Sequence, residues 1–183
     1  MLLLLSCLGM KQITLITGGA RSGKSAHALQ LANSTAGARR YFIATAEALD
    51  DEMRERIEHH RRNRPPDYVV IEEPRNLAAE LDKLAGRADV VVLDCLTLWI
   101  SNLMATYGES LHGYDFETRM LTTSLAKAPF STIVVTDEVG AGIVPDNPAS
   151  RQFRDLLGRT NQRVAEIADA VLLMVAGIPL KVK

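Results

Sequence analysis

Residues 18–25 constrain the fold of this chain more than any other part of its sequence. They read Gly-Gly-Ala-Arg-Ser-Gly-Lys-Ser and match the pattern GxxxxGK[ST] at every fixed position. An apolar run over residues 13–17 precedes them, and a helical pattern over residues 24–33 follows. A glycine-rich turn between a strand and a helix lets backbone N–H groups surround phosphate oxygens, and the helix N-terminus adds a favourable dipole. We therefore predict a phosphate-binding loop (P-loop) for a nucleoside triphosphate, formed by Gly18, Gly19, Ala20, Arg21, Ser22, Gly23, Lys24 and Ser25.

Two side chains of this loop have predictable roles. Lys24 is expected to reach the β- and γ-phosphates, and the Ser25 hydroxyl is expected to bind Mg²⁺. Mg²⁺ also needs a carboxylate, and Asp94, which ends an apolar run at residues 90–93, is the best candidate. The alternative role of Asp94 is to cap a helix or a turn.

A second acidic pair, Asp137 and Glu138, ends the apolar run at residues 133–136. This pair is able to position water, metal or substrate, and it is also able to cap a turn. With Val139 and Gly140 it fits the DxxG pattern of GTPase switches, but such short patterns arise often by chance. The guanine-reading NKxD motif is absent from the sequence, so we do not expect a regulatory GTPase.

Short apolar runs alternate with longer helical patterns along the chain. We expect strands over residues 13–17, 41–45, 68–71, 90–94, 133–136, 171–175 and 180–182. We expect helices over residues 24–33, 50–63, 76–85, 96–105, 116–126 and 151–168. This order implies crossover connections and a mostly parallel sheet flanked by helices, with apolar strands buried on both faces. The expected fold class is therefore α/β, with residues 1–183 in a single domain and ligands at the carboxyl ends of the strands.

Composition and charge exclude several classes of protein. The hydrophobic content of 47% is enough for a sizeable core. The formal net charge of -1 argues against non-specific nucleic-acid binding and against a polybasic membrane anchor. Cys7 and Cys95 lie far apart and lack any CxxC or Cys/His spacing, so we expect neither a disulfide framework nor a structural zinc site. Cytoplasmic localisation is the simpler interpretation. No stretch approaches the ~20 uninterrupted apolar residues of a membrane span.

The first ten residues, 1–10, resemble a lipoprotein signal only faintly. Leu2, Leu3, Leu4 and Leu5 precede Ser6, Cys7 and Leu8, but no positive region comes first and the apolar run is short. We expect that Met10 is the natural start, or that these residues lengthen the first strand.

Residues 50–65 form the most unusual segment. The first turn is acidic and the last is basic, which complements the helix dipole and is typical of a solvated surface helix. Two adjacent histidines, His59 and His60, before a cluster of arginines also suit covalent chemistry, because an imidazole is able to attack phosphorus while arginines neutralise the developing charge. Adjacent helix positions point about 100° apart, so only one histidine is expected to face the site.

The ordered set of segments resembles one family along nearly the whole chain. From residue 13 onward the matching segments are ITGGARSGKS, YFIATAEALDDEM, RIEHHRRNRP, VVVLDCLTLW with SNL after it, TDEVGAGIVP and RQFRDLLGRTNQRVAEIADAVLLMVAGIPLKVK. They are similar to the bifunctional adenosylcobinamide kinase/adenosylcobinamide-phosphate guanylyltransferase family of cobalamin biosynthesis. The resemblance implies a RecA-like P-loop fold and assembly as a homotrimer.

The resemblance also implies two reactions at one nucleotide site. ATP or GTP phosphorylates the aminopropanol hydroxyl of adenosylcobinamide, and GTP then transfers GMP to that phosphate through a guanylyl-histidine, giving adenosylcobinamide-GDP. The family's nucleophile lies five residues before the proline of an Arg-Pro pair, which is His60 here, with His59 as the alternative. The resemblance places around the GTP Thr45, Ala46, Glu47, Arg61, Arg62, Asn63, Arg64, Glu72 and Asp94. The family also has glutamate at the position of Asp94, which weakens a strict metal-binding role for that residue.

Two other functions remain open at this point. A small-molecule P-loop kinase would use the P-loop and Asp94, and His60 would have no catalytic role. A nucleotide-dependent switch module would carry out no small-molecule chemistry. The P-loop holds the outer phosphates, so guanylyl transfer requires the His60 helix to move or GTP to bind differently in the two reactions. No motif defines a corrinoid pocket, although loops over residues 140–148 and 107–114 are candidates.

Overall fold

The computed structural model describes residues 11–48, 51, 54, 55, 58 and 66–183. Of the helix expected over residues 50–63, the described positions are helical. The predicted site residues that lie outside the described ones are His59, His60, Arg61, Arg62, Asn63 and Arg64. Residues 1–10 also lie outside them.

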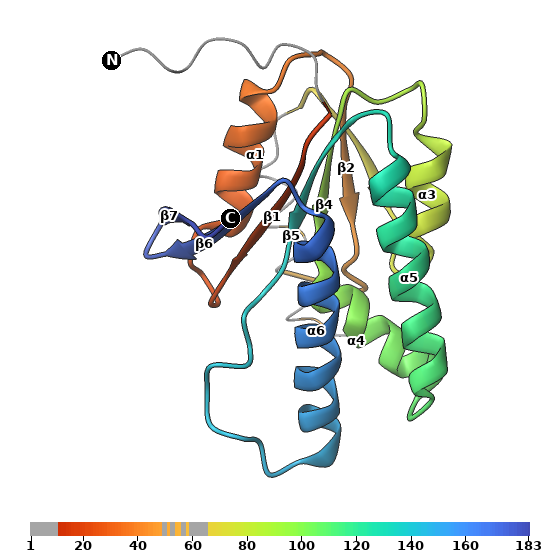
Figure 1. Ribbon diagram of the computed structural model, residues 1–183, viewed down its shortest axis with the longest axis vertical. Helices are drawn as coiled ribbons and strands as arrows, with labels where there is room; N and C mark the ends of the chain where they lie inside the picture. The colour runs from red at the N-terminus through yellow and green to blue at the C-terminus, as the bar shows by residue number, and fades with distance from the viewer. Residues whose placement is uncertain (1–10, 49–50, 52–53, 56–57, 59–65) are drawn as a thin grey trace.

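The described strands form one seven-stranded sheet in the order β3-β2-β4-β5-β1-β6-β7 (Figure 1). Their bounds are β1 Ile13–Gly18, β2 Arg40–Ala44, β3 Tyr68–Glu72, β4 Val90–Asp94, β5 Ser131–Val135, β6 Ala170–Val175 and β7 Ile178–Lys181. Neighbouring strands are parallel except for β6 and β7, which are antiparallel. The predicted mostly parallel sheet is confirmed.

Helices cover both faces of this sheet, α1 on one and the remaining labelled helices on the other (Figure 1). Their bounds are α1 Lys24–Ser34, α3 Leu77–Lys83, α4 Leu96–Tyr107, α5 Leu111–Lys127 and α6 Pro148–Ile167. Two cores result. Leu15 points into the larger one with α3–α6, whereas the next residue, Ile16, points into the smaller one with Ala28 and Ala32 of α1. Burial of a large aliphatic side chain such as Leu15 or Ile16 stabilises the fold by about 1.5–3 kcal/mol relative to exposure.

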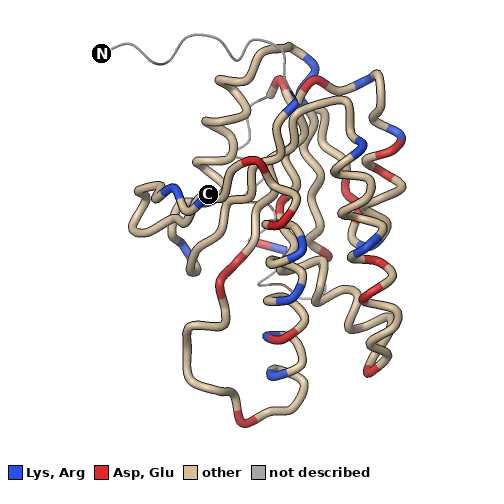
Figure 2. The backbone as a smooth tube through the Cα atoms, viewed as in Figure 1, with Lys and Arg blue, Asp and Glu red and all other residues tan. Residues whose placement is uncertain are grey.

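Charged residues of both signs lie along α3, α5 and α6, whereas the strands carry few charges (Figure 2). β1 and β4 show why, because every residue of β1 is buried and only Asp94 of β4 is partly exposed. A strand that is covered on both faces has no side on which a charge would remain hydrated. The expected burial of the central strands on both faces is therefore confirmed.

α5 begins at Leu111, earlier than the expected start at residue 116. Gly113, which we expected in a loop, lies inside the helix, at a position where a Cβ would lie 2.5 Å from Cδ1 of Tyr107. The glycine thus makes room for the Tyr107 ring. The expected loop over residues 107–114 is consequently wrong for most of its length, since α4 ends at Tyr107 and only residues 108–110 connect the two helices.

The turn between β6 and β7 consists of Ala176 and Gly177. Both turn residues have positive φ, 51° and 84°, as in the tight turns that match the twist of paired strands. Pro179 lies within β7, where it pairs with Met174. A proline is tolerated there because β7 is an edge strand.

Parallel register aligns the carboxyl ends of the central strands. Val135 pairs with Ile16 on one side and with Asp94 on the other, and Asp94 in turn pairs with Ala44. The residues that follow these positions therefore emerge at one edge of the sheet, where ligands of parallel sheets bind. Within the described parts of the chain, no helix has the length and apolarity that crossing a membrane requires.

Candidate nucleotide site

The P-loop connects β1 to α1 with the backbone geometry that a glycine-rich phosphate loop needs. Gly18 has φ 152°, and a Cβ there would lie 2.6 Å from the Met174 carbonyl oxygen and 2.8 Å from Ser22 Oγ. Gly23 has φ 93° and is the residue that precedes α1. The predicted order of strand, turn and helix is confirmed. The first N–H groups of α1 are therefore directed at the site, as a phosphate requires.

Lys24 is the first residue of α1, and its side chain is almost buried, with 8% exposed. Its Nζ donates to the Gly19 carbonyl oxygen at 2.7 Å and lies 2.6 Å from Oδ1 of Asp137. The side chain thus folds back over the P-loop toward the end of β5. The carboxylate in contact with the P-loop lysine is that of Asp137, which the sequence left open between a site residue and a turn cap.

The main chain of Asp137 is fixed on both sides. Its N–H donates to Thr97 Oγ1 at 2.9 Å, and its carbonyl oxygen accepts a hydrogen bond from Asn161 Nδ2 at 3.1 Å. Asn161 is buried on α6 and also accepts from the Thr136 hydroxyl at 2.7 Å. Two helices therefore hold the Asp137 carboxylate beside Lys24.

Glu138 belongs to the same cluster. Its N–H donates to the Gly18 carbonyl oxygen at 3.1 Å, and its Oε1 accepts from the Thr17 hydroxyl at 2.9 Å and from Asn161 Nδ2 at 3.4 Å. Both acids thus support the P-loop strand. Sequence reasoning missed Asn161, for which the one available signal is a polar residue between Leu157 and Val164 on the buried face of α6.

Asp94 and Ser25 lie on different elements of this edge. Asp94 ends β4, which β5 separates from β1, so its Cα is about 10 Å from that of Ile16 at ordinary strand spacing. Ser25 is half-buried in the first turn of α1. Among the described residues, no group of three or more His, Cys, Asp or Glu side chains forms a metal cage. One carboxylate and one hydroxyl suit Mg²⁺, which proteins bind through few side chains together with substrate phosphates.

Cys95 follows Asp94 and is buried. Burial, together with the nearby charge of Asp94, raises the pKa of its thiol to about 12, so the thiol stays protonated and unreactive near neutral pH.

Thr45 follows β2 and has no exposed side-chain surface. Its hydroxyl donates to the Cys95 carbonyl oxygen at 2.7 Å and accepts from the Cys95 N–H at 2.9 Å, while its own N–H donates to the Asp94 carbonyl oxygen at 3.1 Å. The Thr45 side chain therefore ties the ends of β2 and β4 together. Ala46 and Glu47 follow it and are partly exposed at the same edge.

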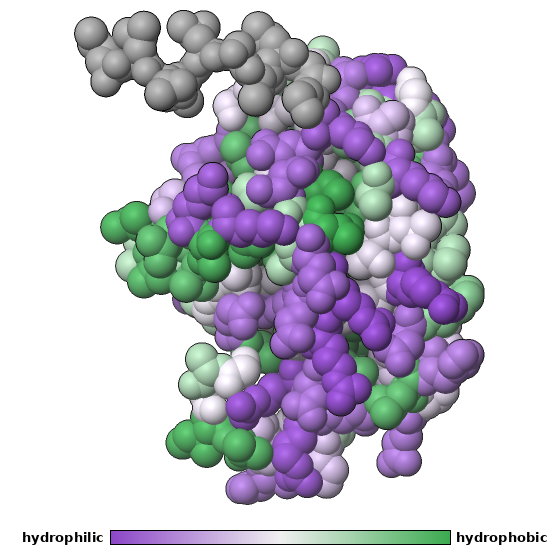
Figure 3. All heavy atoms as spheres, in the orientation of Figure 1, coloured by the Kyte–Doolittle hydropathy of each residue, from purple (hydrophilic) through white to green (hydrophobic). Residues whose placement is uncertain are grey.

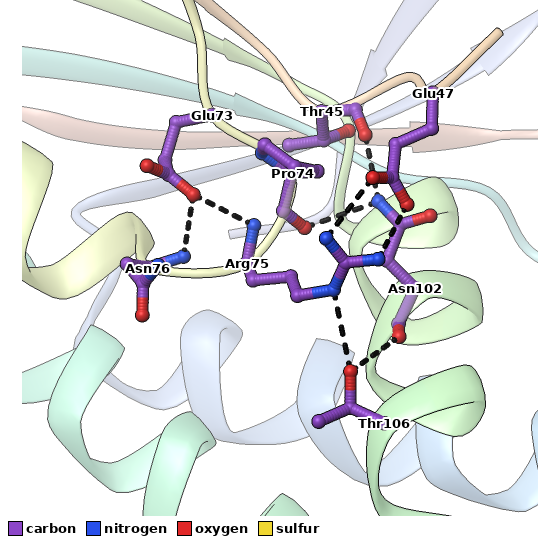
Figure 4. A network of polar contacts seen from close by, with 8 residues as sticks. All are labelled: Thr45, Glu47, Glu73, Pro74, Arg75, Asn76, Asn102 and Thr106. Atoms are coloured by element: carbon purple, nitrogen blue, oxygen red, sulfur yellow. Dashed lines mark hydrogen bonds and ion pairs between the residues drawn. The ribbon is translucent and has the colours of Figure 1, made fainter.

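Glu47 forms a bidentate ion pair with Arg75, which the sequence did not single out (Figure 4). Arg75 lies in the loop after β3, and that strand ends at Glu72, whose side chain is exposed. Among the predicted nucleotide residues, the P-loop, Asp94 and the loop over residues 45–47 thus lie at the same carboxyl edge of the sheet. Glu72 lies one strand further out, where it pairs with Ala44. The predicted histidine and arginine cluster at residues 60–64 lies outside the described residues.

The fold and the site define a P-loop nucleotide-binding protein of the RecA-like class. The chain is similar in structure to a prototypical ATPase from the type III secretion system of pathogenic bacteria, with a TM-score of 0.54. Sequence identity in that comparison is 13%, and it covers 88% of this chain and 50% of the other.

Sequence comparison identifies the family. A family model described as cobinamide kinase / cobinamide phosphate guanyltransferase matches residues 14–182. The chain is 39% identical over 180 residues to the bifunctional adenosylcobalamin biosynthesis protein CobU of Escherichia coli, covering 92% of this chain and 98% of that protein. It is 41% identical over 169 residues to the bifunctional adenosylcobalamin biosynthesis protein CobP of Pseudomonas aeruginosa, covering 92% and 96%. The chain belongs to the cobinamide kinase / cobinamide phosphate guanyltransferase family, and the resemblance found in its sequence is confirmed.

Proposed function

We propose that this protein phosphorylates the aminopropanol hydroxyl of adenosylcobinamide and then transfers GMP from GTP to the new phosphate, giving adenosylcobinamide-GDP. The family match over residues 14–182 supports the pair of reactions. The observation that carries the chemistry is the nearly buried Lys24 on the P-loop, held at the carboxyl edge of the sheet beside Asp137.

In the kinase reaction, the P-loop N–H groups and Lys24 hold the β- and γ-phosphates of the nucleoside triphosphate. The substrate hydroxyl attacks the γ-phosphorus, the bond to the bridging oxygen breaks, and the nucleoside diphosphate leaves while the hydroxyl proton is lost to the surroundings. The oxygen donors Ser25 and Asp94 fit Mg²⁺, which when bound would neutralise charge on the phosphates. Either ATP or GTP suits a loop that contacts only phosphates.

In the guanylyl transfer, His60 is the proposed nucleophile and His59 its alternative. An imidazole nitrogen attacks the α-phosphorus of GTP, a covalent guanylyl-histidine forms, and pyrophosphate leaves. An oxygen of the cobinamide phosphate then attacks the same phosphorus, which frees the histidine. The residues proposed to hold GTP during this reaction are Thr45, Ala46, Glu47, Arg61, Arg62, Asn63, Arg64, Glu72 and Asp94.

The loop between β5 and α6 is the proposed contact for the corrinoid. Ile143 is 95% exposed and Val144 62% exposed there, which offers apolar surface to a large macrocycle. We further propose that the protein is cytoplasmic and forms a homotrimer, for which light scattering of the purified protein gives the mass.

Incubation with GTP labelled on the α-phosphate tests the proposal. We expect acid-labile label on the protein, lost in the variant His60→Ala and retained in His112→Ala, which alters an exposed histidine on α5. Label that moves to cobinamide phosphate supports the complete reaction. Phosphorylated cobinamide without labelled protein would instead indicate a kinase alone, and nucleotide hydrolysis indifferent to cobinamide would indicate a switch module.

A further inference from the structure

The ion pair between Arg75 and Glu47 joins two loops that leave neighbouring strands (Figure 4). Arg75 Nη1 donates to Oε1 of Glu47 at 3.0 Å and Nη2 donates to Oε2 at 2.7 Å. A bidentate pair of this kind fixes the plane of the carboxylate as well as its position. The Glu47 side chain is 25% exposed and that of Arg75 is 39% exposed, so the carboxylate remains accessible at the edge of the sheet.

The main chain of Arg75 is itself held on both sides. Its N–H donates to Glu73 Oε1 at 2.9 Å, and its carbonyl oxygen accepts a hydrogen bond from Trp99 Nε1 at 2.8 Å. Trp99 is buried in the larger core, with 1% exposed. The guanidinium therefore projects from a backbone that is anchored to the core through α4.

α4 holds both loops in addition to this anchor. Asn102, with 6% exposed, donates through Nδ2 to the Thr45 carbonyl oxygen at 2.7 Å and to the Pro74 carbonyl oxygen at 3.0 Å. Arg75 Nε also donates to Thr106 Oγ1 at 3.3 Å. The loop after β2 is thus fixed to the loop after β3 by one buried amide and one ion pair, shown side by side in Figure 4.

We propose that Arg75 is a positioning residue for guanylyl transfer. The inference rests on the proposed function, in which Glu47 contacts GTP and the chain continues from this loop into the segment that carries His60. Arg75 holds the Glu47 carboxylate in one orientation, and in the proposed function this carboxylate contacts GTP. The proposed phosphoryl transfer uses Lys24 on α1, which contacts Gly19 and Asp137, and we expect it to proceed without this ion pair.

The variant Arg75→Gln tests this role. We expect the rate of guanylyl-protein formation from α-labelled GTP to fall by about 10- to 100-fold, the usual effect of removing a partner that orients a ligand-binding side chain. The kcat of cobinamide phosphorylation at saturating nucleotide should stay within about threefold of the wild type. Arg75→Lys keeps the charge but not the bidentate geometry, and we expect an intermediate rate of guanylyl transfer.

Arg39→Gln is the matched control. Arg39 forms a comparable ion pair with Asp89 at 2.6 Å, but it precedes β2 and therefore lies at the opposite edge of the sheet. We expect this variant to carry out both reactions at wild-type rates. A double variant, Glu47→Gln with Arg75→Gln, should transfer GMP no more slowly than Glu47→Gln alone, because the ion pair acts through Glu47.

Two results would overturn the inference. Guanylyl transfer by Arg75→Gln at the wild-type rate would show that the ion pair positions nothing, and an equal fall in both reactions with a lower melting temperature would show that Arg75 only supports the fold. The proposed function is tested separately in the same assay, because it fails if the wild-type protein itself forms no guanylyl-protein.

Discussion

Lys24 and Asp137 show how one contact defines the chemistry of the site. The lysine shares its ammonium group between the Gly19 carbonyl oxygen and the Asp137 carboxylate. A triphosphate that uses Lys24 must compete with Asp137 for the same donor, and its negative charge is repelled by that carboxylate. The negative charge of Asp137 therefore weakens the binding of a nucleotide that carries no metal ion.

The variant Asp137→Asn should bind metal-free ATP more tightly than the wild type. Removing one negative charge beside Lys24 should lower the dissociation constant by about tenfold, equal to about 1.4 kcal/mol. Calorimetric titration in the presence of a chelator measures this constant. Asp155→Asn, which removes an exposed carboxylate from α6, should leave it unchanged. Weaker binding by Asp137→Asn would show that the carboxylate supports the P-loop more than it repels phosphate.

Individual site residues were predictable from the sequence only where a local pattern identifies them. The P-loop is such a pattern, because its glycines and Lys24 are fixed in spacing by the turn that they form. Asn161 and Arg75 belong to no pattern, since each acts on a residue that the sheet order brings near from a distant part of the chain. Thr45 was predicted as a nucleotide residue from the family, whereas the structure shows its hydroxyl engaged with the backbone of Cys95.

At the scale of elements, the β6–β7 hairpin is part of the P-loop's support. The Gly177 N–H donates to the Ser22 carbonyl oxygen at 3.0 Å, and a Cβ on Gly23 would lie 3.3 Å from Gly177 Cα. Of the two strands, β7 is exposed and largely apolar, as Figure 3 shows on the left side of the molecule, with Ile178 69% and Leu180 58% exposed. The conformation of this turn is therefore coupled to that of the P-loop.

The variants Gly177→Val and Gly86→Val separate this coupling from stability. Both glycines have positive φ, 84° and 74°, and in both a Cβ would meet nothing within 4 Å, so each substitution costs about 1–2 kcal/mol of backbone strain. Thermal unfolding should therefore show similar losses. Only Gly177→Val should also weaken ATP binding, by about fivefold, because a strained turn disturbs the hydrogen bond from residue 177 to the Ser22 carbonyl oxygen of the P-loop. Equal ATP affinities for the two variants would contradict the coupling.

Elements were predicted where propensity and packing agree. β4 was predicted with its observed bounds because a continuous apolar run ending in an acid suits a central parallel strand. The start of α5 was missed because glycine is unfavourable inside helices and usually indicates a loop. Here the Tyr107 ring leaves no room for a Cβ at Gly113. Such a requirement depends on how two helices pack, and no local pattern reports it.

At the scale of the whole molecule, the sequence predicted the α/β class and the edge at which ligands bind, since these follow from the alternation of strands and helices. The strand order was not predicted, and it is what places β5 between β1 and β4 and hence Asp137, rather than Asp94, beside Lys24. The opposite, amino edge of the sheet has a different role. There Arg39 and Asp89 join the starts of β2 and β4, and Asp89 also accepts hydrogen bonds from the N–H groups of Ala38 and Arg39.

This amino-edge contact should make the stability of the protein depend on pH in acid. The hydrogen bond and charge of Arg39 lower the pKa of Asp89 from 3.8 to about 2. A carboxyl group with a lowered folded-state pKa stabilises the protein above its unfolded-state pKa, and this stabilisation is lost as the pH falls from about 4 to about 2.

In the variant Arg39→Gln, most of this stabilisation should be absent at any pH. The difference in urea midpoint between wild type and Arg39→Gln should therefore be largest at neutral pH and shrink between pH ~4 and ~2. A wild-type advantage over Arg39→Gln that stays constant down to pH ~2 would mean that Arg39 stabilises the amino edge through its hydrogen bond to the Gly86 carbonyl oxygen and not through the charge of Asp89.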